Sequence, residues 1–193
     1  MAVMKILRLG DETLRKKSHP VTKIDRRTIG LLKDMAETMY AADGCGLAAP
    51  QVGILRRMVV IDVGDGLIEL INPEIIATSG EQTDDEGCLS VPGLSFPTAR
   101  ATHATVSGLD ENGEPVTVVG TGLLARCLQH EVGHLDGFLY TDVLTGRWKR
   151  RAKKEIKHEG WTVAGITWTP GVDEDPFGHD EPDSLDKGRE DDA

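Results

Sequence analysis

The chain has 193 residues and is 39% hydrophobic, which is enough for one folded domain with an ordinary core. Three cysteines exclude a disulfide framework, and no apolar stretch is long enough to span a membrane. The net charge of −10 is uneven. Residues 171–193 contain ten acidic and two basic side chains and carry −8, which leaves −2 for residues 1–170. The overall acidity therefore does not exclude a basic surface on the larger part.

Two features of the composition predict the location and the domain organisation. Residues 1–10 lack the apolar run of a secretion signal, and a few unpaired cysteines suit a reducing compartment. We therefore expect a cytoplasmic protein without membrane contact. The acidic residues 171–193 include proline and glycine, a composition typical of disordered chain. We predict one folded domain over residues 1–170 and a disordered tail over residues 171–193.

The N-terminal part predicts a short extended segment over residues 4–9, a helical turn over residues 11–17 and then a long helix. Asp25 is a suitable N-cap for this helix, and apolar residues recur at helical spacing as far as Tyr40. Residues 44–51 read Gly-Cys-Gly-Leu-Ala-Ala-Pro-Gln. From composition alone, a simple connecting loop is the favoured interpretation of this stretch.

The middle of the chain carries strand signals. An apolar run over residues 58–63, the turn residues Asp65-Gly66 and residues 67–71 predict a hairpin, which Asn72-Pro73 ends. Further extended segments are predicted over residues 74–78, 86–92, 100–109 and 115–120. Residues 81–86 are expected to be an acidic surface run.

A helix predicted over residues 121–137 contains the sequence His130-Glu131-x-x-His134. Together with Cys127, these residues share one face, because positions three, four and seven apart lie on the same side of a helix. Two imidazoles one turn apart can bind one metal ion, and the adjacent carboxylate can transfer protons there. A helix that merely carries two histidines is the less favoured alternative, because the motif is specific.

The next segment is strongly basic. Residues 147–157 predict a helix with seven lysines and arginines, and residues 161–169 predict a strand. A solvated helix face is the favoured interpretation of the basic run, and contact with nucleic acid is the alternative.

A metal site with two histidines needs at least one more protein ligand. A third histidine six residues after His134 is excluded, because Tyr140 stands there. Glu155 or Glu159 could supply the ligand from the following helix. Cys88 is the other candidate, since a thiolate suits a borderline-soft divalent ion. Spacing alone leaves these possibilities open.

Three separated motifs, taken together, resemble a known family. They are residues 44–51, the Glu-Gly-Cys-Leu-Ser of residues 86–90 and the Gln-His-Glu-Val-Gly-His-Leu-Asp-Gly of residues 129–137. In order and spacing they are similar to the signatures of bacterial-type peptide deformylases, and the resemblance covers about residues 4–145. It departs at Gly133, where the family commonly has an acidic residue. The implied fold is α+β, with antiparallel β-sheets packed around a central HExxH-bearing helix.

The resemblance implies a metal-dependent hydrolase that removes the formyl group from the N-terminal formyl-methionine of new proteins and releases formate. Residues 1–170 would form the catalytic domain. One divalent ion is expected, Fe²⁺ in the first place, with Zn²⁺, Ni²⁺ or Co²⁺ as substitutes. The implied metal ligands are Cys88, His130 and His134.

The resemblance also assigns catalytic and structural roles. Glu131 would transfer protons, and the Gln51 amide and the Leu89 backbone N–H would stabilise the oxyanion. Glu86 and Arg100 would form an ion pair that fixes the strand carrying Cys88.

Substrate contacts follow from the same resemblance. Cys45 and Cys127 are expected to line an apolar slot for the methionine side chain, and Gly46 is expected to contact the substrate main chain. Residues 93–97 could pair with the extended peptide as an added strand.

The expected partners are the nascent formyl-Met polypeptide and, transiently, the ribosome, with no DNA. Two alternatives remain open at this point. One is an HExxH peptidase that uses Glu155 or Glu159 as a ligand. The other is a non-catalytic protein that binds ribosomes or RNA through residues 147–157 and carries a structural metal.

Overall fold

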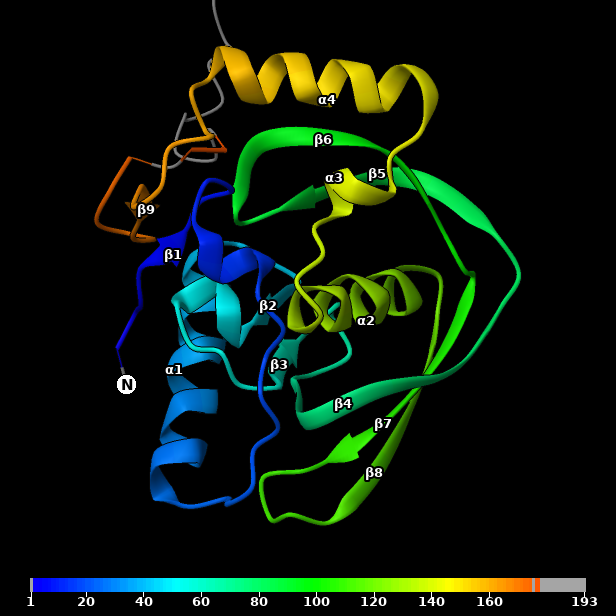
Figure 1. Cartoon of the computed structure of the whole chain (residues 1–193). Coiled ribbons are helices and arrows are strands. Elements are labelled where there is room, and N and C mark those ends of the chain that lie inside the picture. The colour runs from blue at the N-terminus through cyan, green and yellow to red at the C-terminus, as the bar shows by residue number, and fades with distance from the viewer. Residues whose placement is uncertain (1, 175, 178–193) are drawn as a thin grey trace, which may run out of the picture.

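Antiparallel sheets enclose the helix that carries the HExxH motif (Figure 1). The computed structural model describes residues 2–174 and 176–177. Helix α2 (Gly122–Leu135) lies between a five-stranded sheet and the separate hairpin of β5 (Gln82–Cys88) and β6 (Val91–Arg100). The predicted α+β architecture around a central helix is confirmed.

The five-stranded sheet separates two helices. Its strand order is β2-β3-β4-β7-β8, with all pairs antiparallel. Successive residues of a strand face opposite sides. In β3, Met58 and Val60 accordingly pack with helix α1 (Arg26–Ala41), whereas Val59 and Ile61 pack with α2. The strand bounds are β2 (Gly46–Ala48), β3 (Met58–Ile61), β4 (Ile68–Ser79), β7 (His103–Leu109) and β8 (Pro115–Thr121).

Helix α1 (Arg26–Ala41) begins as the sequence predicts. The Asp25 carboxylate accepts hydrogen bonds from the backbone N–H groups of Arg27 and Thr28, which satisfies two donors that the first turn leaves free. Leu32, Met35 and Met39 then form the buried stripe against the sheet. This packing places the end of α1 beside β2 and the cavity described below.

The C-terminal elements cover the β5-β6 hairpin. The short helix α3 (Tyr140–Val143) leads into α4 (Gly146–His158), whose apolar face packs on β6 (Figure 1). Phe96 of β6 and Trp148 of α4 have ring centroids 6.2 Å apart. Strand β9 (Thr167–Trp168) then pairs with β1 (Ile6–Leu7), and the short helices η1 (Glu12–Arg15) and η2 (Ala49–Val52) lie nearby.

Several local predictions need correction. Residues 44–51 are not a plain loop, because their small side chains allow β2 to pair with β3 before η2 begins. Strand β4 continues through Asn72-Pro73 as an irregular region, with Asn72 at a φ of 52°. Glu86, predicted to belong to an acidic surface run, is buried at 4% exposure, whereas Glu81, Asp84 and Asp85 of that run are exposed as predicted. The strand predicted over residues 161–169 is limited to Thr167–Trp168.

The chain after Pro170 is described only in part. Thr169 N–H donates to the Asp173 carboxylate at 2.7 Å, and Phe177 packs against Trp168. Residues 175 and 178–193 of the predicted tail lie outside the described residues, and the division at residue 170 stays a prediction. Within the described part, no helix combines the length and the apolar character needed to cross a membrane.

Candidate metal centre

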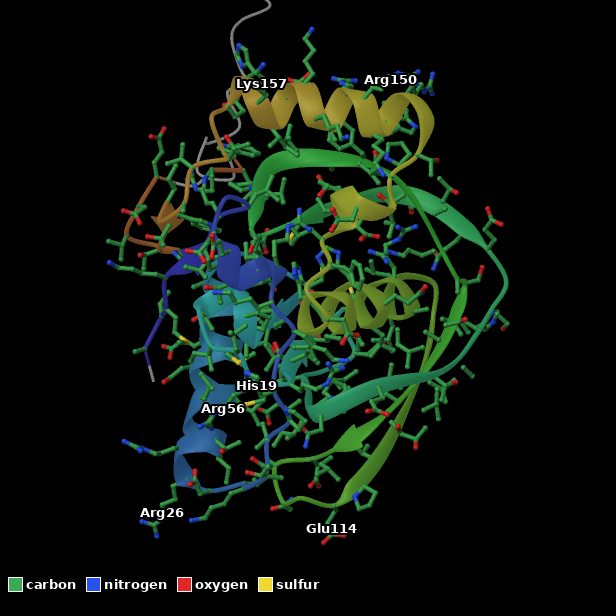
Figure 2. All side chains as sticks on the ribbon, viewed as in Figure 1. His19, Arg26, Arg56, Glu114, Arg150 and Lys157 are labelled. Atoms are coloured by element: carbon green, nitrogen blue, oxygen red, sulfur yellow. The ribbon has the colours of Figure 1, made fainter. Side chains whose placement is uncertain are left out.

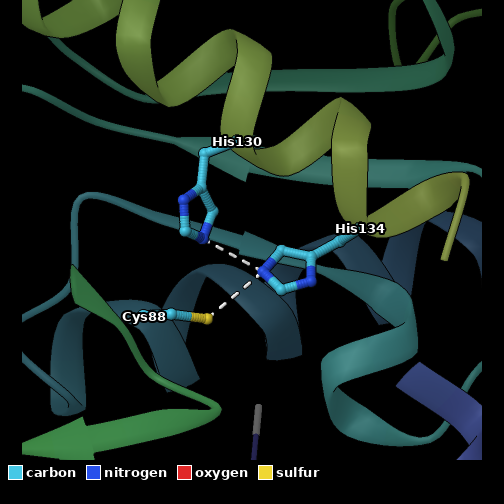
Figure 3. A group of neighbouring side chains, drawn as sticks. All are labelled: Cys88, His130 and His134. Carbon is cyan, nitrogen blue, oxygen red and sulfur yellow. Dashed lines mark hydrogen bonds between the residues drawn. The ribbon is translucent and has the colours of Figure 1, made fainter. Parts of the chain in front are cut away.

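The two histidines of the motif lie one turn apart on α2 and face the same side (Figure 3). His130 Nε2 and His134 Nε2 are 3.1 Å apart, and both rings are buried. Cys88 approaches them from the end of β5, with its Sγ 3.3 Å from His134 Nε2. The three ligand atoms all lie within 4.8 Å of one another.

Cys88 reaches this position because of a tight turn. It pairs with Val91, so that only Leu89 and Ser90 connect β5 to β6, and the register shifts between Glu86 and Cys88. Leu9 N–H donates to the Ser90 carbonyl at 2.9 Å, which anchors the turn to the N-terminal segment. A residue 42 positions before the first histidine is thereby placed over α2.

Glu86 is the centre of a buried polar network. Its carboxylate accepts hydrogen bonds from Arg100 at 2.6 and 3.1 Å and from Arg126 at 2.8 Å, and it lies 2.7 Å from His130 Nδ1. Burial by itself would raise the pKa of Glu86, but hydrogen bonds from His130 and Arg100 outweigh it and lower the pKa to about 2.

An ionised carboxylate can only accept hydrogen bonds. Nδ1 of His130 therefore carries a hydrogen, which is directed at Glu86, and Nε2 faces Cys88 and His134.

Glu131 lies beside the three converging atoms, at 4% exposure, and its Oε2 has no hydrogen-bond partner among the described residues. Burial raises its pKa to about 7. Gly46 of β2 passes so close that a Cβ there would lie 2.5 Å from Glu131 Oε1. A carboxyl in this position can accept and release a proton near neutral pH.

Gln51 is buried at 1% exposure and is oriented by one backbone group. Its Oε1 accepts a hydrogen bond from Ala48 N–H at 2.8 Å. The Nε2 donor group therefore points into the centre, 3.6 Å from Cys88 Sγ and 3.3 Å from Ser90 Oγ.

These groups line a cavity of about 320 Å³. Cys45, Gly46, Cys127 and Leu89 are among its walls. A hydrogen bond from the Cys127 thiol lowers the pKa of Cys45 to about 6 and raises that of Cys127. The cavity is mainly apolar apart from its acidic and metal-binding groups, as a site for an apolar side chain requires.

Sequence reasoning missed three residues at this site. Arg126 binds Glu86 and the Thr98 carbonyl, and it also lines the cavity. The sequence does indicate Arg126, because it lies one helical turn before His130 and therefore on the same face of α2. Ser90 and Phe177 gave no comparable signal, because their positions depend on a turn and on a segment distant in sequence.

The competing ligands do not reach the centre. Glu155 lies on α4 and Glu159 caps its end, on the far side of the β5-β6 hairpin from α2 (Figure 1). Glu155 instead forms an ion pair with Arg151. The HExxH peptidase alternative, which needs one of these ligands, is therefore wrong.

The donor set fits a metal ion. The ligand atoms of a thiol and two imidazoles converge to within 4.8 Å of one another, and a tetrahedral ion held by three such groups keeps one position open. The Glu86 carboxylate behind His130 supplies the outer hydrogen bond that metal-binding histidines usually make. With Glu131 alongside in an open cavity, fold and site define a metal-dependent hydrolase.

Comparison with known proteins gives the family. A family model described as polypeptide deformylase matches residues 3–150. The chain is 52% identical to peptide deformylase 2 of Corynebacterium efficiens, over 93% of this chain and 100% of the relative. A peptide deformylase structure from Legionella pneumophila superposes with a TM-score of 0.77 at 44% identity, covering 82% of this chain and 96% of the other.

A second structure, from Synechococcus elongatus in complex with actinonin, has a TM-score of 0.77 and 40% identity over 83% and 90% of the two chains. The chain belongs to the peptide deformylase family. It is a metal-dependent hydrolase that removes the formyl group from the N-terminal formyl-methionine of newly made proteins.

Proposed function

We propose that the residues around the cavity carry out this deformylation with defined roles. Cys88, His130 and His134 hold one divalent ion, and Glu131 is the proton-transfer group. The observation that carries the proposal is the convergence of three ligand atoms within 4.8 Å beside a buried carboxyl. The products are formate and a polypeptide with a free amino terminus.

The bound ion supplies Lewis-acid chemistry, which lowers the pKa of water and polarises a carbonyl oxygen. Glu131 accepts a proton from the attacking water and delivers it to the amine nitrogen of the methionine. One C–O bond forms, and the C–N bond of the formamide breaks. Glu86 keeps the proton of His130 on Nδ1, so that Nε2 stays available as a ligand.

The negative charge that develops on the former formyl oxygen is stabilised by hydrogen-bond donors. Gln51 Nε2 is directed into the centre and is one of them. The Leu89 backbone N–H, in the turn that follows Cys88, is the second. Donors held in place before the reaction stabilise this charge better than mobile water does.

The substrate lies along β2 and the turn of the β5-β6 hairpin. Cys45 and Cys127 form the wall of the slot for the methionine side chain, and Gly46 contacts the substrate main chain because it has no side chain of its own. Residues 93–97 lie within β6, and pairing of an extended peptide with them is the remaining part of this proposal.

The ion is Fe²⁺, with Zn²⁺, Ni²⁺ or Co²⁺ as substitutes. Oxidation of Fe²⁺ or of Cys88 would inactivate the enzyme. We expect activity to fall during purification in air and to survive when Fe²⁺ is supplied anaerobically or when Ni²⁺ or Co²⁺ replaces it. Full activity in an air-purified preparation that contains only zinc would refute the assignment.

The protein acts in the cytoplasm, on nascent chains and in transient contact with the ribosome. Helix α4 supports the ribosome contact, because its apolar face packs on β6 and its lysines and arginines are exposed. Arg150 and Lys157 lie along α4, far from Arg26 at the start of α1 (Figure 2). The exposed cations are Arg147, Lys149, Arg150, Arg151, Lys153, Lys154 and Lys157.

The decisive experiment is formate release from a formyl-Met peptide by the wild type and by Glu131→Gln, with metal content measured in both. We expect kcat to fall about 10²–10⁴-fold in the variant, because proton transfer is lost, while bound metal stays near one ion per chain. Equal activity of the two proteins would show that Glu131 is not the proton-transfer group.

A further inference from the structure

Phe177 lies outside the part of the chain that defines the family, yet it lines the cavity of the metal centre. The family match ends at residue 150, and Phe177 follows β9 on the acidic C-terminal segment. Its ring meets that of Trp168 at a centroid separation of 5.8 Å and an angle of 61°. It also packs with Leu89 against a cluster that includes Ala42.

The C-terminal segment is held by several contacts. Trp168 Nε1 donates to the Leu89 carbonyl at 3.0 Å, and β9 is paired with β1. The backbone N–H of Asp173 donates to the Thr169 carbonyl at 2.9 Å, which folds the chain back after β9. The Pro176 carbonyl then passes Gly93 of β6, where an added Cβ would lie 3.1 Å from it.

Phe177 and the HExxH helix contribute different walls of the cavity. Cys127 and Arg126 come from α2, whereas Phe177 contacts the Trp168 ring and packs, as Leu89 does, against the cluster that includes Ala42. If the methionine side chain lies against Cys127, the polypeptide after it must leave past the other walls. Phe177 and Leu89 offer an apolar surface there.

We propose that Phe177 contacts the side chain of the residue that follows formyl-methionine and favours an apolar side chain at that position. This inference rests on the proposed function, because the position of the methionine slot at Cys127 is part of that proposal. Phe177 is a specificity-determining residue, and the chemistry at the metal does not need it.

The test compares two substrates, formyl-Met-Leu-Ala amide and formyl-Met-Gly-Ala amide, with the full-length protein. For Phe177→Ala, kcat/KM with the leucine peptide should fall about tenfold, mainly through KM, because one apolar contact is lost. The glycine peptide should change less than twofold. Phe177→Leu should restore most of the preference. Val172→Ala, on the same segment at 79% exposure, is the matched control and should leave both substrates unchanged.

Two results would overturn the inference. An equal loss on both peptides would mean that Phe177 acts only by supporting Trp168 and the Leu89 turn, and a lower Tm would accompany it. An unchanged preference for leucine would mean that Phe177 does not contact this residue. If wild-type protein released formate from neither peptide, the proposed function itself would fail, and this inference with it.

Discussion

At the residue scale, the direction of the Gln51 amide depends on one backbone group. Ala48 N–H binds Oε1, which turns Nε2 toward Cys88. We predict that Gln51→Ala lowers kcat by about 10²–10³-fold with little loss of bound metal, because one oxyanion donor is removed. Steady-state formate release and metal analysis measure both quantities.

The matched control for this substitution is Gln82→Ala. Gln82 also donates two hydrogen bonds, to the Ala101 and Gly122 carbonyls, but away from the cavity. Its loss should lower the free energy of unfolding and leave kcat unchanged. If both variants lost activity to the same extent, the role proposed for Gln51 would be reduced to a structural one.

The Cys45 thiol gives a pH-dependent prediction. It is exposed at the cavity, and the Cys127 hydrogen bond lowers its pKa to about 6. The thiolate is the reactive form, so alkylation by iodoacetamide should rise between pH 5 and about 7 and then level off. Mass spectrometry locates the modification, with Cys45→Ser as the control. A rate that rises only between about pH 8 and 9 would show that the pKa is not lowered.

At the scale of elements, two glycines near the end of α2 should respond oppositely to alanine. Gly133 has open space around its Cβ position, so Gly133→Ala should stabilise the helix by up to ~1 kcal/mol and raise Tm by about 2–4 °C. Gly137 has a φ of 80°, and its Cβ would lie 2.6 Å from the Arg15 carbonyl oxygen. Gly137→Ala should therefore lower Tm. Thermal unfolding of both variants checks the pair, and a shared direction would contradict it.

Glu86 lies on β5 and connects it to two other elements, because Arg100 lies on β6 and both Arg126 and His130 lie on α2. Glu86→Ala would leave the buried Arg126 without its carboxylate partner. We expect the free energy of unfolding to fall by about 3–5 kcal/mol, with loss of activity. Asp84→Ala, at an exposed position of the same strand, should change stability by less than about 0.5 kcal/mol. Near-normal stability and activity of Glu86→Ala would rule out the structural role.

At the scale of the whole molecule, seven exposed lysines and arginines are concentrated on α4, although the net charge of the chain is −10. If α4 contacts ribosomal RNA, binding should weaken as salt rises, because cations on the protein displace counterions. Reversing Arg150 and Lys157 to glutamate should reduce the slope of log K against log salt by about two. Co-sedimentation with ribosomes measures it. Reversing Arg26 and Arg56 changes the net charge equally and should leave the slope as in wild type.

Much of the fold was predictable because its signals are local. The Asp25 cap, the apolar repeat of α1, the Asp65-Gly66 turn and the period of α2 each depend on a few neighbouring residues. The family and its activity were also predictable, because three motifs in order are specific. Both predictions are confirmed.

Other features were not predictable, because they depend on pairing between distant segments. Residues 46–48 look like a connector until β3 is available to pair with them. Glu86 looks like part of a surface run until Arg100 and Arg126 are packed around it. Propensity carries no information about such partners.

The sequence by itself determined that α2 carries two imidazoles and a carboxylate on one face, because helical spacing is a property of the local backbone. Only the tertiary structure decided which distant side chain joins them. The tight turn after β5 brings Cys88 to the histidines, while the hairpin keeps Glu155 and Glu159 away. The tertiary structure also decided that Phe177, which lies far beyond the signature motifs, reaches the cavity, because that contact depends on how β9 pairs with β1.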